Sequence, residues 1–164
     1  MGKIFYHDIC RRGIIYFFGG YYMTHQNPHS DESSQPTSTK SNRSKEQTQL
    51  DFELEFFGGI LNRYPDYVDV LRVQGNNLTI KGRFAEGLKI DKRLVKLRPT
   101  DPLIHYNLAC SYALLNRKDQ AIVTLRRAVE LGYRDFRYLR QDKDLEAIRH
   151  DPRFRQLLHE YDNH

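Results

Sequence analysis

The stretch HYNLACSYALLNRKDQAIVTLRRAVELGY, residues 105–133, holds the clearest structural pattern in this chain. It reads as two amphipathic helices on either side of a short polar segment, because apolar residues recur at helical spacing in both halves. Small residues stand at Ala109, Ala121 and Ala128. Small side chains at fixed intervals let neighbouring helices approach closely, so we expect a tightly packed helical hairpin here.

The same pattern occurs once more, 34 residues earlier in the chain. Gly75 aligns with Ala109, and Gly87 aligns with Ala121. A repeat of this length is typical of proteins built from stacked helical hairpins. Two hairpins are therefore predicted, with helices over about residues 67–81 and 84–97 in the first and 102–115 and 118–131 in the second.

Turn and cap residues mark the expected ends of these helices. Gly82 suits the turn inside the first hairpin, and Gly132 suits the end of the second as a C-terminal glycine. Asp101 is placed to cap the third helix, while Pro102 fits its first turn.

This pattern resembles the tetratricopeptide repeat family, whose members stack helical hairpins. The resemblance implies an all-α fold, a short helical-hairpin array that winds as an α-α superhelix, and a protein-binding role. No tryptophan is present, so Leu71 and His105 stand where the family usually has one. The residues that carry the resemblance are Gly75, Leu78, Gly87 and Pro99 in the first block, and Leu108, Ala109, Tyr112, Ala121, Leu125 and Ala128 in the second.

Segments on both sides extend the predicted array. LDFELEFFGGILNRYP, residues 50–65, is predicted to form a single helix packed on the first hairpin. DKDLEAIRHDPRFRQLLHEY, residues 142–161, resembles the ending that follows many bacterial arrays of the family. It is expected to cap the last hairpin, which would otherwise expose its core face. The predicted repeat domain covers residues 50–164.

The first 49 residues differ from this domain. Residues 24–49 are dominated by polar residues, a composition that buries too little apolar surface to fold, so we expect a disordered tail over residues 1–49. Residues 13–23 are apolar and aromatic but too short for a membrane-spanning helix. Two interpretations of residues 1–22 stay open: they precede a translation start at Met23, or they form a weak anchor.

The basic charge of the chain is spread rather than clustered. The net charge is +5, and from residue 50 on there are 20 Lys and Arg against 17 Asp and Glu. The densest arginine run, Arg126–Arg140, is interleaved with acids, whereas nucleic-acid recognition requires a basic stripe or patch. Solvated helix faces are the favoured interpretation. A nucleic-acid-binding adaptor using the Arg126–Arg140 face is the alternative.

Four polar side chains are candidates for a binding groove. In the tetratricopeptide subgroup that binds the C-terminal carboxylate of chaperone peptides, basic and Asn side chains stand on the first helices of successive repeats. Arg72, Asn76, Asn107 and Arg137 are spaced in a way that resembles this layout. Their amides and guanidinium groups would give charge-assisted bonds to a carboxylate. Arginine stands where lysine is usual and Gln141 replaces the last basic residue, so Asn side chains that bond only neighbouring backbone remain the alternative interpretation.

Residue patterns for catalysis are weak. Asp142, Asp144 and Asp151 have the spacing of helix caps and turns, and His105 and Cys110 stand five residues apart on one helix, so the two do not share a face. We therefore expect no enzymatic activity, no cofactor and no bound metal.

The predicted role is that of a scaffold or adaptor that holds a peptide or helix of another protein. Self-association through the Phe-rich first helix, with Phe52, Phe56 and Phe57, is a second interpretation. Cys10 and Cys110 form no metal-binding spacing, and a buried Cys110 fits a reducing compartment. We expect a cytoplasmic location and neither a membrane nor a nucleic acid as partner.

Overall fold

The computed structural model describes residues 38–162, and the side chains of residues 48–161. The chain divides into two units, residues 1–44 and 45–164. The second unit holds the helical array and is described here by itself. The predicted disordered tail and the two interpretations of residues 1–22 concern a segment that, up to residue 37, lies outside the described residues.

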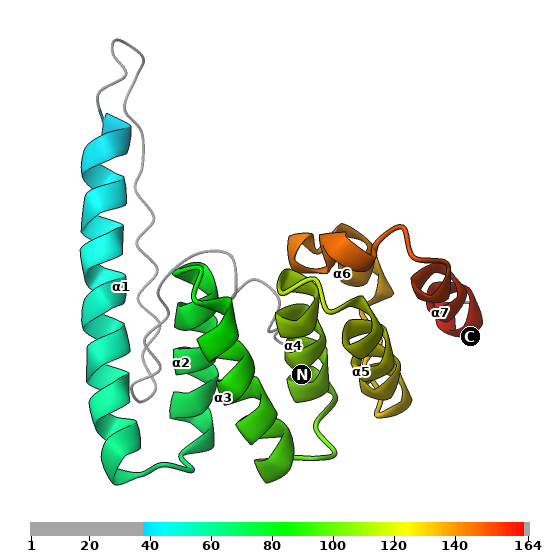
Figure 1. Cartoon of the computed structure of the whole chain (residues 1–164), viewed down its shortest axis with the longest axis horizontal. Helices are drawn as coiled ribbons and strands as arrows, with labels where there is room; N and C mark the ends of the chain where they lie inside the picture. Colours follow the sequence, from blue (N-terminus) through cyan, green and yellow to red (C-terminus); the bar gives the residue numbers. More distant parts are fainter. Residues whose placement is uncertain (1–37, 163–164) are drawn as a thin grey trace, which may run out of the picture. The chain divides into compact units, whose positions relative to one another are not determined.

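Between residues 38 and 162 the chain is all-α, as predicted, with no β-strand (Figure 1). The helices follow one another with short connections. In chain order they are α1 (Ser38–Arg63), α2 (Val68–Ile80), α3 (Phe84–Leu97), α4 (Pro102–Leu114), α5 (Lys118–Glu130), α6 (Phe136–Gln141), the 3-10 helix η2 (Lys143–Ile148) and α7 (Pro152–Asp162).

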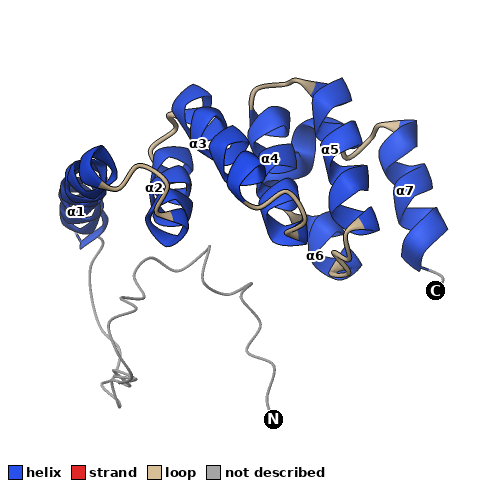
Figure 2. Cartoon of the chain, turned by 90° about the horizontal axis from the view of Figure 1, so that it is seen from below, coloured by secondary structure: helices blue, strands red, loops and turns tan. Residues whose placement is uncertain are grey.

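Two helical hairpins form the centre of the array. α2 packs against α3, α4 packs against α5, and α3 packs against α4, so that each hairpin contacts the next (Figure 2). α4 begins 34 residues after α2, and α5 begins 34 residues after α3. The internal repeat predicted from the sequence is thus a structural repeat, and the predicted helical-hairpin array is confirmed.

The helix ends follow from the cap and turn residues. The Asp101 carboxylate accepts hydrogen bonds from the backbone N–H groups of Leu103 and Ile104 at 2.9 and 3.3 Å, which satisfies two of the unpaired donors at the start of α4. Gly82 and Gly132 have φ angles of +78° and +111°, in the left-handed region that favours glycine. Both glycines therefore close their helices as predicted.

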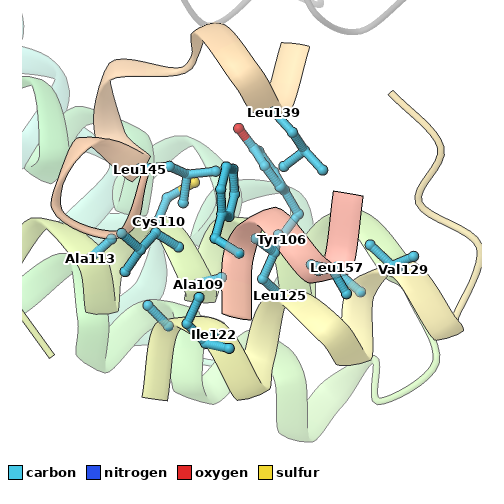
Figure 3. Close-up of a cluster of buried hydrophobic side chains, with 14 of the residues drawn as sticks. Tyr106, Ala109, Cys110, Ala113, Ile122, Leu125, Val129, Leu139, Leu145 and Leu157 are labelled. Carbon is cyan, nitrogen blue, oxygen red and sulfur yellow. The ribbon is translucent and has the colours of Figure 1, made fainter. Parts of the chain in front are cut away.

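The small residues allow close packing of the second hairpin. Ala109, Ala121 and Ala128 are fully buried in the core between α4 and α5, which Figure 3 shows around Leu125 and Val129. A larger side chain at these positions would force the two helices apart.

The C-terminal segment covers the end of the array, as expected for a cap. η2 packs on α4 and α5, and α7 packs on α5. The Asp151 side chain accepts a hydrogen bond from the backbone N–H of Arg153 at 2.9 Å and so caps α7. Without this segment the α4–α5 core would face water. The side chains that insert into this core and are almost completely buried are Leu145, Ile148, Phe154 and Leu157.

The first helix begins earlier than the predicted domain boundary. The sequence predicts a boundary near Leu50, whereas α1 begins at Ser38. Half of residues 38–49 are Lys, Arg, Glu or Gln, the rest are Ser, Thr and Asn, and the segment has neither Pro nor Gly. These good helix formers extend a helix at little cost once the following residues are packed, because the unfavourable nucleation step has already been made. None of the helices within residues 38–162 is long and apolar enough to cross a bilayer.

Candidate functional site

One face of α2 is open to solvent. Asp69, Val73, Asn76 and Ile80 follow one another at intervals of four, three and four residues, so they lie along one side of the helix, and all four are exposed. Two of them are apolar: Val73 is 39% exposed and Ile80 is 57% exposed. We call these four residues the α2 face. It combines apolar contact area with an amide, which is the combination that a peptide-binding surface needs.

The other sides of α2 are occupied by its neighbours. A Cβ at Gly75 would lie 3.2 Å from Ile90 Cγ2, so α3 approaches the α2 backbone closely at this point. Towards α1, the Gln74 amide donates to the Leu54 carbonyl at 3.2 Å, and the Asn77 amide donates to the Glu53 carboxylate at 3.0 Å. These contacts fix the rotation of α2 and so hold the α2 face outward.

The equivalent face of α4 is less exposed and is partly covered by the cap. The residues 34 positions after the α2 face are Leu103, Asn107, Cys110 and Leu114. Cys110 is buried, and its thiol lies 3.6 Å from a carboxylate oxygen of Asp142, which comes from the C-terminal cap. Leu103 packs against the core of the second hairpin. The cap therefore covers α4 at Cys110, while Asn107 on the same face stays half-buried.

Arg72 is held by another residue of the array. Its guanidinium forms an ion pair with the Asp101 carboxylate, the cap of α4, and both side chains are about one-third exposed. Its Nε atom is buried and has no hydrogen-bond partner among the described residues. Arg72 thus links the first hairpin to the start of the second, and its charge is already balanced before any ligand binds.

The other three predicted groove residues lie on separate helices. Asn76 is exposed on α2, Asn107 is half-buried on α4, and Arg137 is exposed on α6. Neither asparagine side chain forms a hydrogen bond with the described residues, so their amides are available to a ligand. Within residues 48–161, no hydrogen bond or ion pair joins any two of the four predicted residues. Arg72 and Asn76 lie one turn apart on α2. Arg72 is paired with Asp101, the residue that precedes α4.

Two buried carboxylates, Asp91 and Asp142, form hydrogen bonds between neighbouring elements of the array, and the sequence did not indicate the partners of either. Asp91 on α3 accepts a hydrogen bond from the Ser111 hydroxyl on α4. Burial raises the pKa of Asp91 to about 6, and the hydrogen bond from Ser111 opposes that rise. Asp142 accepts a hydrogen bond from the Tyr106 hydroxyl and also caps η2 through the backbone N–H of Asp144 at 3.1 Å.

The Tyr106 hydroxyl and the Cys110 thiol, which lie next to Asp142, are held in a buried environment. Burial raises the pKa of the Tyr106 hydroxyl and the pKa of the Cys110 thiol well above their ordinary values, which keeps both groups protonated. A protonated, buried thiol is a poor nucleophile. The Tyr106 ring stacks on Tyr133 with centroids 4.5 Å apart. This cluster therefore fastens the cap to α4.

The arginines of α5 and of the turn after it are mostly engaged. Arg126 pairs with Glu160 at 2.7 Å, and Arg127 pairs with Glu130 at 3.2 Å. The Arg134 guanidinium donates to the Val129 carbonyl at 2.6 Å, at the C-terminal end of α5. Because carboxylates neutralise the first two, these side chains do not form a continuous positive stripe of the kind that binds phosphates.

Comparison with known proteins gives a partial similarity. No protein-family model matches the chain. The chain is similar to a protein of Arabidopsis thaliana whose name describes it as chloroplastic, with 32% identity over 92 residues. The match covers 54% of this chain and 28% of the Arabidopsis protein, so this chain spans little more than a quarter of that relative.

Proposed function

We propose that this chain is a protein-interaction module that binds an extended peptide or a helix of another protein on the α2 face. The observation that supports this most is the open pair of apolar residues on α2. Val73 and Ile80 lie on one side of a helix whose equivalent in the next hairpin is partly covered by the cap. Isolated exposed apolar residues are common, but two of them on one side of a helix, beside an amide that has no partner among the described residues, offer a directed contact surface.

The polar residues would orient the bound segment. The amide of Asn76 can donate to and accept from a peptide backbone, and Asn107 can do the same from α4. Arg72 would act mainly by fixing the start of α4, because Asp101 already balances its charge. Arg137 is the member of the set that has both an exposed position and a full charge to offer a carboxylate.

We propose further that the hairpins are tetratricopeptide-type repeats and that the module has a binding rather than a catalytic role. Support comes from the 34-residue spacing of equivalent helices, from the close approach at Gly75, and from the buried alanines of the second hairpin. The name of the Arabidopsis relative places that protein in the chloroplast. For this chain, a cytoplasmic location stays a prediction.

A random-peptide display library tests the proposed surface. The full chain should select peptides, and a Val73→Ser/Ile80→Ser variant should bind the selected peptides about tenfold or more weakly, because each buried apolar side chain contributes roughly 1.5–3 kcal/mol. Val123→Ser is the matched control, since Val123 on α5 is 69% exposed and lies outside the α2 face. Equal loss in the control, or no loss in the double variant, would reject the α2 face as the binding surface.

The carboxylate-binding interpretation is tested by the chemistry of the peptide end. If Asn76, Asn107 and Arg137 bind a terminal carboxylate, a selected peptide with a free C-terminus should bind more tightly than its C-terminal amide. The difference should be lost in the Asn107→Ala/Arg137→Ala variant. Equal affinity for acid and amide would leave the α2 face as a binding surface for internal peptide segments.

A further inference from the structure

The outer side of α1 carries an aromatic surface that the described part of the chain does not cover. Phe52 is 62% exposed and Phe56 is 54% exposed, and their rings are stacked with centroids 6.1 Å apart. The opposite side of α1 faces the array, with Leu54 buried and Leu61 packed against the core of the first hairpin. The helix thus has apolar residues on both sides, and only one side is used within the described residues.

Gly59 lies on the same side as the two phenylalanines. It follows Phe56 by three residues and Phe52 by seven, which is the spacing of one helix face. A Cβ built at Gly59 would meet nothing within 4 Å. Glycine inside a helix is destabilising relative to alanine. Within the described residues, no neighbour of Gly59 is close enough to exclude a side chain there. A second backbone that approaches closely at this point would require it.

Two opposite charges flank Gly59 symmetrically. Glu55 precedes it by four residues and Arg63 follows it by four, so both lie on its side of α1. Both are exposed, and neither forms an ion pair with the described residues. When two copies of such a helix cross antiparallel at Gly59, Glu55 of each copy faces Arg63 of the other. The charge pattern is therefore self-complementary.

We propose that two copies of this chain pair through α1, antiparallel and with a two-fold axis at Gly59. Phe56 then packs beside Gly59 of the second copy. Phe52 lies seven residues from Gly59, roughly 10 Å along the helix at about 1.5 Å per residue. That distance carries it past the end of α1 of the second copy, to the shallow hollow lined by Arg63, Tyr64, Pro65, Asp66 and Tyr67.

This interface is isologous, because each copy contributes the same surface. It is independent of the proposed peptide binding, since it uses none of the four residues of the α2 face. Pairing would bring two α2 faces into one particle and so make the module bivalent towards a partner.

Charge reversal at the two flanking positions gives the sharpest test. Glu55→Arg alone and Arg63→Glu alone each place like charges opposite one another twice, so each variant should associate roughly tenfold or more weakly than the wild type in sedimentation equilibrium of the full chain. An equimolar mixture of the two variants restores opposite charges at the contacts between unlike copies. The mixture should therefore form a heterodimer more readily than either variant forms its homodimer.

Further variants separate a lost interface from a lost fold. Phe52→Ser/Phe56→Ser should abolish pairing while the helical circular dichroism signal is retained, and Val123→Ser on α5 should pair like the wild type. Three results would overturn the proposal: a wild type that stays monomeric up to its solubility limit, a pair of reversed variants that each still pair as the wild type does, or a phenylalanine double variant that still pairs.

Discussion

At the scale of single residues, the most informative group is the buried carboxyl of Asp91. It lies between the two hairpins, where α3 meets α4, and it accepts a hydrogen bond from Ser111. It also lies beside Gly75, where a Cβ would come within 3.4 Å of an Asp91 oxygen and within 3.2 Å of Ile90 Cγ2. Burial disfavours the charged form of such a group, and one hydroxyl only partly compensates.

Asp91→Asn should therefore raise stability at neutral pH. The pKa is about 6 in the folded chain against an ordinary 3.8, so the folded state binds the proton more tightly than the unfolded state. The stability that this site contributes is fully present below about pH 4 and is lost as pH rises through 6. An Asn cannot ionise but can still accept from Ser111, so the variant should gain on the order of 2 kcal/mol at pH 7 and much less at pH 4.

Urea denaturation of both proteins between pH 4 and pH 7 measures this difference. The difference between the two curves isolates Asp91, because the other titrating groups are common to both proteins. A variant that is less stable at pH 7, or a difference that does not change with pH, would mean that Asp91 is not a destabilising ion in the folded chain.

At the scale of elements, the start of α4 joins the two hairpins. Asp101 caps the helix and also accepts the ion pair from Arg72 on α2. Leu71, Leu94 and Ile104, from α2, α3 and α4, form the apolar core next to it. One carboxylate therefore stabilises a helix end and its contact with the preceding hairpin together.

Asp101→Ala should cost about 0.5–2 kcal/mol in the free energy of unfolding, the range for lost N-caps. Asp66→Ala is the matched control. Asp66 is also an aspartate paired with an arginine, Arg93, at 2.9 Å, but this pair is exposed and should contribute less than about 0.5 kcal/mol. Equal costs for the two variants in urea denaturation would show that the cap of α4 contributes nothing beyond a surface ion pair.

The sequence predicted the helices of the hairpins to within a residue or two, because caps and glycines mark their ends locally. Gly82, Asp101 and Gly132 each do so without reference to the rest of the fold. The start of α1 was missed, since a polar sequence of good helix formers extends a helix only when the adjoining segment is packed. The burial of Cys110 was predicted and is confirmed, but the sequence did not indicate that Asp142 lies against its thiol, because this is a tertiary contact between distant residues.

The candidate site was predicted only in outline. The sequence placed Arg72, Asn76 and Asn107 on the first helices of the two hairpins, and they lie there. It did not indicate that Asp101 holds Arg72, or that Val73 and Ile80 stay exposed. Which ion pairs form and which side chains stay exposed depend on how the hairpins and the cap pack. A repeat pattern alone does not specify either.

At the scale of the whole second unit, the array has an open and a closed part. The first hairpin presents the α2 face to solvent, while the cap covers part of the matching face of the second, at Cys110. A short array needs such a cap, because the last hairpin has no following repeat to cover it. Covering α4 in this way stabilises the array. Of the two helices that begin the hairpins, α2 then has the more open face, which is why we propose peptide binding there.

The most direct test of that proposal follows the backbone amides of the full, isotope-labelled chain by NMR while a library-selected peptide is added. We expect shifts in residues 69–80 and around Asn107, and no comparable shifts in the Val73→Ser/Ile80→Ser variant. Shifts that gather instead on α5 and α7, or along the outer side of α1, would contradict peptide binding on the α2 face.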